Sequence, residues 1–224
     1  MNARLPDASV TTGNPNVRPT ASGRKRRSDG ERSFRVIMEA AVRLAVDRGL
    51  DGLSINDLAV ETGMSKGGLY AHFGSKQALQ LATIVEAARV QADLVVDPAL
   101  RLADPLARLH ALCENFLRCV QEGPTGGCFL ASVSAEFDTR PGVVRDSILE
   151  QHQLWGGMLV QLVEGARDAG QLELRGKDAA QLAFEVNALL HLGNDAYVLY
   201  RDTEVLQRAR QGLAWLLDQH GTGI

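Results

Sequence analysis

The sequence predicts an all-α fold, and three observations support this prediction. Apolar residues recur at helical spacing over several long segments, capping residues and glycines mark the expected helix ends, and no segment shows strand-like alternation. The chain has 224 residues, of which 45% are hydrophobic and 23% are charged. This length and composition are sufficient to bury a core without disulfides or a metal ion.

Composition excludes several classes of protein. The sequence contains no apolar run near the ~20 residues that cross a bilayer, and no apolar block follows Arg4 that could serve as the core of a signal peptide. We therefore expect a cytoplasmic protein. The three cysteines form no C-x-x-C pair, and their odd number is typical of a reducing compartment. We expect Cys113, Cys119 and Cys128 to be small buried apolar residues, with a redox role as the alternative.

Positive charge is concentrated near the N-terminus, although the formal net charge of the chain is -3. Residues 1–30 are rich in Pro, Ser, Thr, Asn and Gly and contain the basic run Arg24-Lys25-Arg26-Arg27, so we expect a disordered basic tail there. A local basic segment attracts a polyanion within a Debye length of about 8 Å. A nucleic acid is therefore a candidate partner.

Three helices are expected after this tail. Apolar residues at helical spacing from Ser33 predict a first helix that ends at Gly49. Ser54, with Asp57 three positions later, predicts the start of a short second helix that ends at Gly63. Ser65 is placed to cap a third, spanning Lys66 to about Phe73.

Two short helices joined by a glycine-containing turn are typical of a helix-turn-helix motif. In that motif the second helix lies in the major groove of DNA and contacts base edges with residues near its N-terminus. Leu58, Ala59, Leu69 and Phe73 are spaced to form a shared core. The opposite face and the following turn then hold the candidate DNA contacts Ser65, Lys66, Gly67, Gly68, Tyr70, His72 and Lys76.

Gly67 and Gly68 are unusual in so short a helix, because each costs roughly 1 kcal/mol relative to alanine. Close approach of the helix backbone to DNA is one explanation, and a frayed turn is the alternative. The basic run Arg24–Arg27 likewise has two interpretations. It either reaches into the minor groove or remains a solvated tail without a defined contact.

The segment resembles the N-terminal DNA-binding domain of the tetracycline-repressor (TetR) family of bacterial transcription regulators, over about residues 33–80. The resemblance is carried by Gly63-Met64-Ser65 and by Gly68-Leu69-Tyr70-Ala71-His72-Phe73-Gly74-Ser75-Lys76-Gln77-Ala78-Leu79. The paired glycines depart from many relatives, which combine one small residue with a larger one. The resemblance implies DNA contacts at the groove or backbone by Ser54, Asn56, Lys66, Gly67, Tyr70, His72 and Lys76.

The remainder of the chain is also expected to be helical, which gives a DNA-binding domain at 31–78 and a ligand-binding and dimerisation domain at 79–224. Caps and periodicity predict helices from Ser75 to about Asp93, from Pro105 through Val120, and over 143–169, 177–200 and 204–219. Gly126-Gly127 and Arg140-Pro141-Gly142 interrupt the chain on either side of Phe129–Phe137. The last two resemble the pair that forms a four-helix dimer interface in this family. Burial within one chain is the alternative for the expected interface residues Leu189, Leu192, Ala196, Tyr197, Leu213 and Leu216.

A ligand pocket is expected within this second domain, since pockets combine apolar walls with a few polar groups. The partner would be a small apolar or amphipathic effector, and solid core packing is the alternative interpretation. The candidate lining residues are Phe116, Phe129, Phe137, Trp155, Met158, Leu162 and Phe184, with the polar side chains of Asn187 and His191.

The sequence contains no phosphate-binding loop, zinc-ligand spacing or nucleophile motif, so we expect no catalytic residue, metal site or cofactor. It predicts a homodimeric regulator that represses transcription from a palindromic operator and is released by its effector. Two alternatives remain. One is a redox-responsive regulator that uses the cysteines, and the other is a dimeric interaction module that has lost DNA binding.

Overall fold

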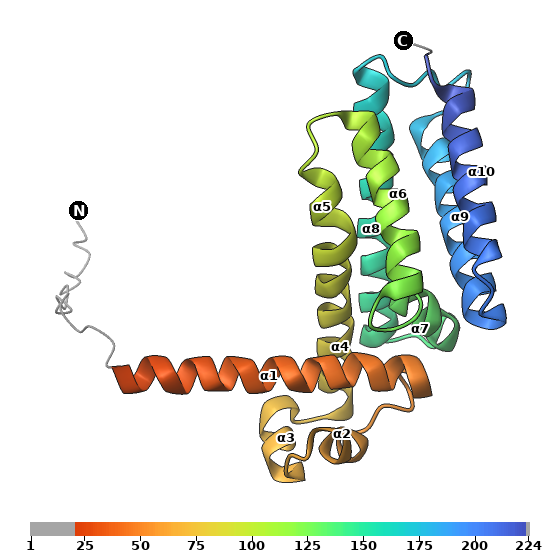
Figure 1. Ribbon diagram of the computed structural model, residues 1–224. Coiled ribbons are helices and arrows are strands. Elements are labelled where there is room, and N and C mark those ends of the chain that lie inside the picture. Colours follow the sequence, from red (N-terminus) through yellow and green to blue (C-terminus); the bar gives the residue numbers. More distant parts are fainter. Residues whose placement is uncertain (1–20, 223–224) are drawn as a thin grey trace, which may run out of the picture. The chain divides into compact units, whose positions relative to one another are not determined.

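The computed structural model describes residues 21–222, and side chains from residue 33 onward. Every element in this part of the chain is helical, apart from one isolated antiparallel bridge between Leu172 and Gly221 (Figure 1). The predicted all-α class is confirmed. The helices are α1 (Ala21–Arg48), α2 (Ile55–Thr62), α3 (Lys66–Phe73), α4 (Lys76–Gln91), the π-helical segment η1 (Ala92–Val96), α5 (Asp97–Leu100), α6 (Pro105–Glu122), α7 (Phe129–Phe137), α8 (Val143–Asp168), α9 (Ala179–Tyr200) and α10 (Glu204–His220).

Contacts divide the chain into two units, residues 1–35 and residues 36–224. In the first unit, α1 begins at Ala21, whereas apolar periodicity predicted a start at Ser33 and a disordered tail through residue 30. The basic stretch has good helix formers but no apolar stripe, which explains why periodicity missed it. Residues 1–20 and the side chains of Arg24, Lys25, Arg26 and Arg27 lie outside what the structure describes.

The second unit begins with a small core shared by the C-terminal part of α1 and by α2, α3 and the start of α4. Leu58, Leu69 and Leu79 are fully buried in it, and Phe73 is 9% exposed. The expected caps are present. Ser54, Ser65 and Ser75 each accept a hydrogen bond from the backbone N–H three residues ahead, and Gly63 ends α2 in the left-handed region with φ of 66°.

The connection from the first core to the rest of the molecule is longer than predicted. A single helix was expected to end near Asp93, but the chain continues through η1 and α5 to Leu100. In a π-helix the backbone hydrogen bonds join residues five apart instead of four. The buried side chain of Asn115 on α6 donates to the carbonyl of Val95 at 3.1 Å and so stabilises the segment.

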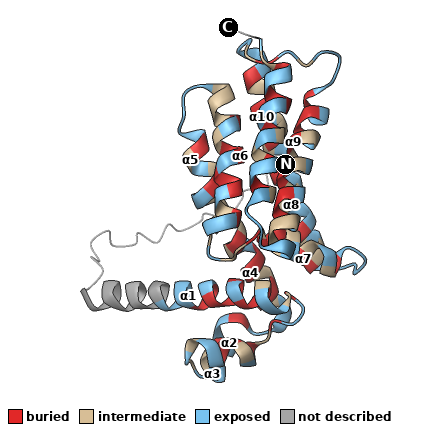
Figure 2. Ribbon diagram, turned by 45° about the vertical axis from the view of Figure 1, so that its right-hand side comes forward, coloured by how far each residue is buried: buried red, intermediate tan, exposed pale blue. Residues whose placement is uncertain are grey.

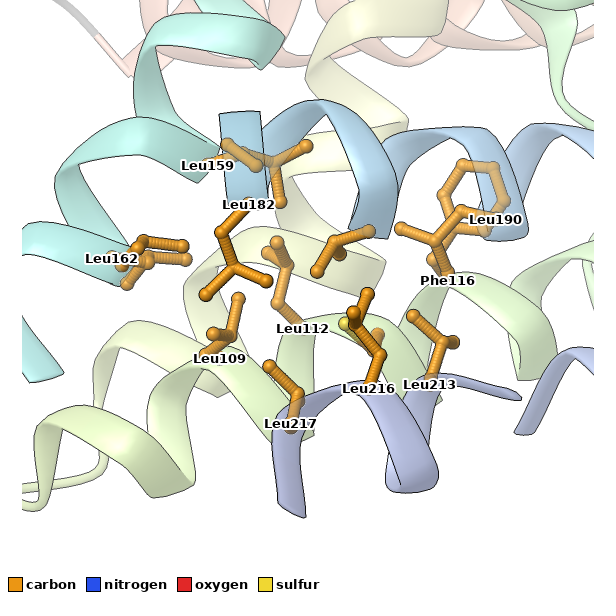
Figure 3. Close-up of a cluster of buried hydrophobic side chains, with 14 of the residues drawn as sticks. Leu109, Leu112, Phe116, Leu159, Leu162, Leu182, Leu190, Leu213, Leu216 and Leu217 are labelled. Atoms are coloured by element: carbon orange, nitrogen blue, oxygen red, sulfur yellow. The ribbon is translucent and has the colours of Figure 1, made fainter. Parts of the chain in front are cut away.

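A second and larger core lies among α6, α8, α9 and α10, which pack against one another. Figure 3 shows leucines from all four helices meeting in this core, with Phe116 at one side of it beside Leu190 and Leu213. The apolar stripes that face this core contrast with the exposed residues on the opposite sides of the same helices (Figure 2). This packing determines which face of α9 points into the core. The sequence could not predict that face, because α9 is apolar over most of its circumference.

Candidate nucleic-acid interface

The exposed face of α3 contains most of the side chains predicted to contact DNA. Lys66, Tyr70 and His72 are exposed, with Tyr70 at 55%, while Leu69 and Phe73 anchor the helix in the first core. Ser65 caps α3 through its Oγ atom, which accepts the N–H of Gly68 at 3.1 Å. The helix thus presents Lys66 at its N-terminus, where backbone N–H groups favour anions, and carries the Tyr70 phenol in its middle and the His72 imidazole in its last turn.

The two glycines of α3 differ in their surroundings. A Cβ atom at Gly68 would lie 3.2 Å from the Oγ of Ser65, so the cap itself favours glycine there. A Cβ atom at Gly67 would meet nothing within 4 Å. Packing among the described residues therefore does not require glycine at position 67. Close approach of an external partner to the backbone is a remaining explanation for the missing side chain.

At the start of α2, Ser54 and Asn56 have different roles. Asn56 is exposed. Ser54 Oγ donates to Asp57 Oδ2 at 2.5 Å and accepts the Asp57 N–H at 3.1 Å, so it serves the helix cap. These interactions and an ion pair with Arg48 at 2.8 Å lower the pKa of Asp57, the Ser54 hydrogen bond being the largest cause. A phosphate contact by Ser54 would have to replace its bond to this carboxylate.

Lys76 also has an intramolecular role that the sequence did not predict. Its ammonium group donates to the backbone carbonyl of Asp51 and lies 3.3 Å from the Oδ1 atom of the same residue. Arg140 donates to the other carboxylate oxygen at 2.8 Å. The pKa of Asp51 is lowered, first by the Arg140 hydrogen bond and then by Lys76. Lys76 therefore holds the loop between α1 and α2 as well as lying near the expected phosphate backbone.

Helix α7 also holds the loop between α1 and α2. The two carboxylate oxygens of Glu136 accept the backbone N–H groups of Leu50 and Asp51, each at 3.0 Å. Gln80 on α4 donates to the Leu50 carbonyl at 3.0 Å. Glu136, Arg140 and Gln80 thus connect the helix-turn-helix to α4 and α7. Sequence reasoning missed all three, because the contacts are long-range and leave no local spacing signal.

The residues predicted to line a ligand pocket do not form one group. Phe116 and Phe129 line a cavity between α4, α6 and α7, and Trp155 and Met158 line a separate hollow beside α4 and α8. Phe137 and Leu162 are buried in the two different cores. The prediction for Phe184 needs correction, because its side chain is 67% exposed and lies in neither space.

The polar candidates for the pocket pair with aromatic neighbours. Asn187 Oδ1 accepts a hydrogen bond from Trp155 Nε1 at 2.8 Å. The His191 ring centroid lies 6.1 Å from that of Phe116 and 6.3 Å from that of His152. These contacts explain how the two polar groups are accommodated beside the larger core.

The expected dimer residues also separate into two groups. Leu192 is 68% exposed on α9, and Leu189, Ala196 and Tyr197 are half-buried. Leu213 and Leu216 are instead buried in the chain's own core, where they pack from α10. For these two residues the alternative of burial within one chain is the observed arrangement. The large apolar residue exposed on α10 is Trp215, at 65%.

Comparison with known proteins identifies the two parts of the chain. Residues 37–83 match the model of bacterial regulatory proteins of the tetR family, and residues 105–213 match the tetracyclin repressor-like C-terminal domain. The chain is 26% identical, over 70% of its length and 81% of the relative's, to the HTH-type transcriptional regulator LmrA of Bacillus subtilis. Among the described helices, none is long and apolar enough to cross a membrane.

Solved structures share the fold. A TetR transcriptional regulator from Chloroflexus aurantiacus aligns with a TM-score of 0.75 at 25% identity, covering 87% of this chain and 98% of that one. AibR, solved in complex with isovaleryl coenzyme A and operator DNA, aligns with a TM-score of 0.63 at 23% identity, covering 81% of this chain and 95% of that one. Together with the helix-turn-helix of α2 and α3, these matches show that the chain belongs to the TetR family of transcriptional regulators.

Proposed function

We propose that this chain is a homodimeric repressor that places α3 in the major groove of a palindromic operator and is released by a small effector. The observation that carries the DNA-binding part is the open surface at Gly67, between the exposed side chains of Lys66 and Tyr70. A backbone without Cβ atoms at the N-terminus of a recognition helix allows close approach to the groove. The complex of AibR with operator DNA and isovaleryl coenzyme A supports the same division of roles, by analogy of fold.

The homodimer is supported by exposed apolar side chains on the last two helices. On α9, Phe184, Leu192 and Leu199 are each at least 67% exposed, and their spacing places them on one helix face. Trp215 adds a large apolar surface on α10. Large exposed apolar residues that cluster on one face mark interaction sites, and a second copy of the chain is the partner proposed here.

The redox alternative finds little support in the surroundings of the cysteines. Burial raises the pKa of Cys113 to about 12 and that of Cys128 to about 11, and it also raises the pKa of Cys119. The thiolate is the form that reacts with oxidants, so these thiols are poorly suited to sensing. A variant with serine at all three positions should keep its DNA binding and any response to peroxide.

The test of DNA binding is selection from random duplexes by the purified protein, in parallel with a Lys66→Ala/Tyr70→Ala variant. We expect an enriched palindrome that the variant loses. The affinity for that duplex should fall as salt increases, because phosphate contacts release counterions. A protein that dimerises but shows no salt-sensitive affinity for any duplex would favour the alternative of an interaction module without DNA binding.

A further inference from the structure

A cavity beside the loop that joins α6 to α7 bears on the chemical class of the effector. A water-sized sphere can be centred in about 40 Å³ of it, and the space of about 500 Å³ between its walls includes open solvent. Its walls come from α1, α4, η1, α6, α7 and the 124–128 stretch of that loop. Six of its fourteen lining residues are valines or phenylalanines, namely Val42, Val90, Val95, Phe116, Val120 and Phe129.

No residue that lines this cavity carries a formal charge. An ionised ligand group placed there would lose its hydration without meeting an opposite charge, which is costly. The two thiols in the wall do not supply that charge. Burial keeps Cys119 and Cys128 in the neutral form, since it raises the pKa of both.

Gln91 provides a polar group for a ligand in this otherwise apolar wall. The hydroxyl of Thr125, another lining residue, already donates to the Gly127 carbonyl at 2.6 Å. The half-buried side-chain amide of Gln91 makes no hydrogen bond with the part of the chain that the structure describes. Gln91 also lines the neighbouring hollow that contains Trp155, so it stands between the two spaces.

The geometry points to an uncharged, mainly apolar small molecule as the ligand of this cavity, held by the apolar walls and by one hydrogen bond to Gln91. The cavity adjoins Phe129, the first residue of α7, and the same helix carries the Glu136 carboxylate that holds the α1–α2 loop. The role of this ligand in releasing DNA rests on the proposed function. Binding of the ligand to the cavity is independent of that function and can be measured without DNA.

Four probes with one aromatic ring and different polar groups test the class of ligand. Toluene, benzyl alcohol, benzoate and benzylammonium are titrated into the full chain without DNA, and binding is followed by ligand-observed NMR. We expect the two neutral probes to bind and the two ions to bind at least about tenfold more weakly. Binding of either ion as tight as that of benzyl alcohol would overturn the inference, as would the absence of binding by both neutral probes.

Two variants test the location. Cys119→Phe adds a ring to the cavity from a half-buried position and should weaken toluene binding at least about tenfold, while Ala103→Phe, at an exposed site, should not. Gln91→Leu should lower the affinity for benzyl alcohol relative to toluene. Unchanged toluene binding by a folded Cys119→Phe protein, or unchanged preference in Gln91→Leu, would place the ligand elsewhere. If the neutral probes bind at this site but do not release the protein from the selected duplex, the ligand site is confirmed and the proposed release from DNA by an effector is wrong.

Discussion

The carboxylate of Glu136 accepts the backbone N–H of Leu50 at 3.0 Å, which joins α7 to the loop that precedes the helix-turn-helix. The same carboxylate lies against the backbone at Gly49, where a Cβ atom would be 2.8 Å from Oε2. Gly49 has φ of 81°, a conformation that glycine adopts without strain. The end of α1 is therefore shaped both by backbone freedom and by space for this carboxylate.

Replacing Glu136 with glutamine should destabilise the protein. The carboxylate satisfies two N–H groups, whereas an amide has a single acceptor oxygen and would turn its NH2 group toward the second N–H. The Leu50 N–H is part-buried and the Asp51 N–H is exposed to water, so the loss of one of these bonds costs about 1 kcal/mol. We expect the free energy of unfolding in urea to fall by about this amount in Glu136→Gln. Glu150→Gln, at an exposed position on α8, is the control, and an equal loss in both variants would contradict the role of Glu136.

Gly67→Ala should separate stability from DNA binding. Alanine has room at this position and is a better helix former, so the free energy of unfolding should rise by up to about 1 kcal/mol. If α3 approaches DNA closely there, affinity for the selected duplex should fall at least about tenfold. Gly157→Ala is a matched control, because a Cβ atom at this exposed position of α8 also meets nothing within 4 Å. Unchanged DNA affinity in Gly67→Ala would remove the argument for close approach.

Lys66 and Lys76 are predicted to act differently, although both lie near the expected phosphate backbone. Lys66→Gln should leave the free energy of unfolding unchanged and reduce the slope of log affinity against log salt by about 1 for each protomer bound. Lys76→Gln loses its hydrogen bonds to Asp51, and should lower the free energy of unfolding by less than about 1 kcal/mol because the pair is exposed. Denaturation and salt titration of both variants distinguish these roles. A salt slope unchanged in Lys66→Gln would exclude its phosphate contact.

Local signals in the sequence were sufficient to predict the short helices and their caps. Ser54, Ser65 and Ser75 each accept a backbone N–H three residues ahead, so the chemistry that makes the cap is contained within four residues of sequence. Asp104 does the same for α6, accepting the Ala107 N–H at 2.6 Å. The exposed face of α3 followed from the same local spacing.

Local sequence signals could not predict the contacts between distant parts of the chain. Periodicity identifies an apolar face but not what it packs against, so Phe184 was assigned to a cavity and Leu213 to an interface with a second copy. The cavity residues Gln91 and Cys119 were missed as ligand candidates because their place in the wall depends on how α4 and α6 pack. Glu136 was missed for the same reason.

Leu192→Glu should weaken dimerisation. The side chain is 68% exposed in one chain, so the substitution should be tolerated by the monomer fold. In the proposed dimer it would bury a carboxylate without a partner, which should raise the dimer dissociation constant at least about tenfold. Leu154→Glu, 62% exposed on α8, is the matched control. Sedimentation velocity over a range of concentrations measures the change, and a wild-type chain that stays monomeric throughout would exclude the homodimer.

Two neighbouring histidines, His152 on α8 and His191 on α9, should make the stability of the fold depend on pH. The Ser134 hydroxyl donates to the Leu130 carbonyl at 2.5 Å, so His152 must donate from Nε2 to Ser134 Oγ at 2.6 Å. Burial lowers the pKa of His152, and it is the largest cause of the lowered pKa of His191. A second cause is the nearby His152, and Asp195 opposes the shift.

Because both pKa values are lower in the folded protein than in the unfolded chain, the unfolded chain binds protons more readily as the pH falls below about 6.5. The histidines' contribution to stability is therefore complete above that pH and is lost progressively below it. We expect the free energy of unfolding to fall less between pH 7.5 and 5.5 in His152→Asn than in the wild-type protein. His110→Asn, exposed on α6, should retain the wild-type dependence. Parallel curves for all three proteins would show that acid destabilisation arises from other groups.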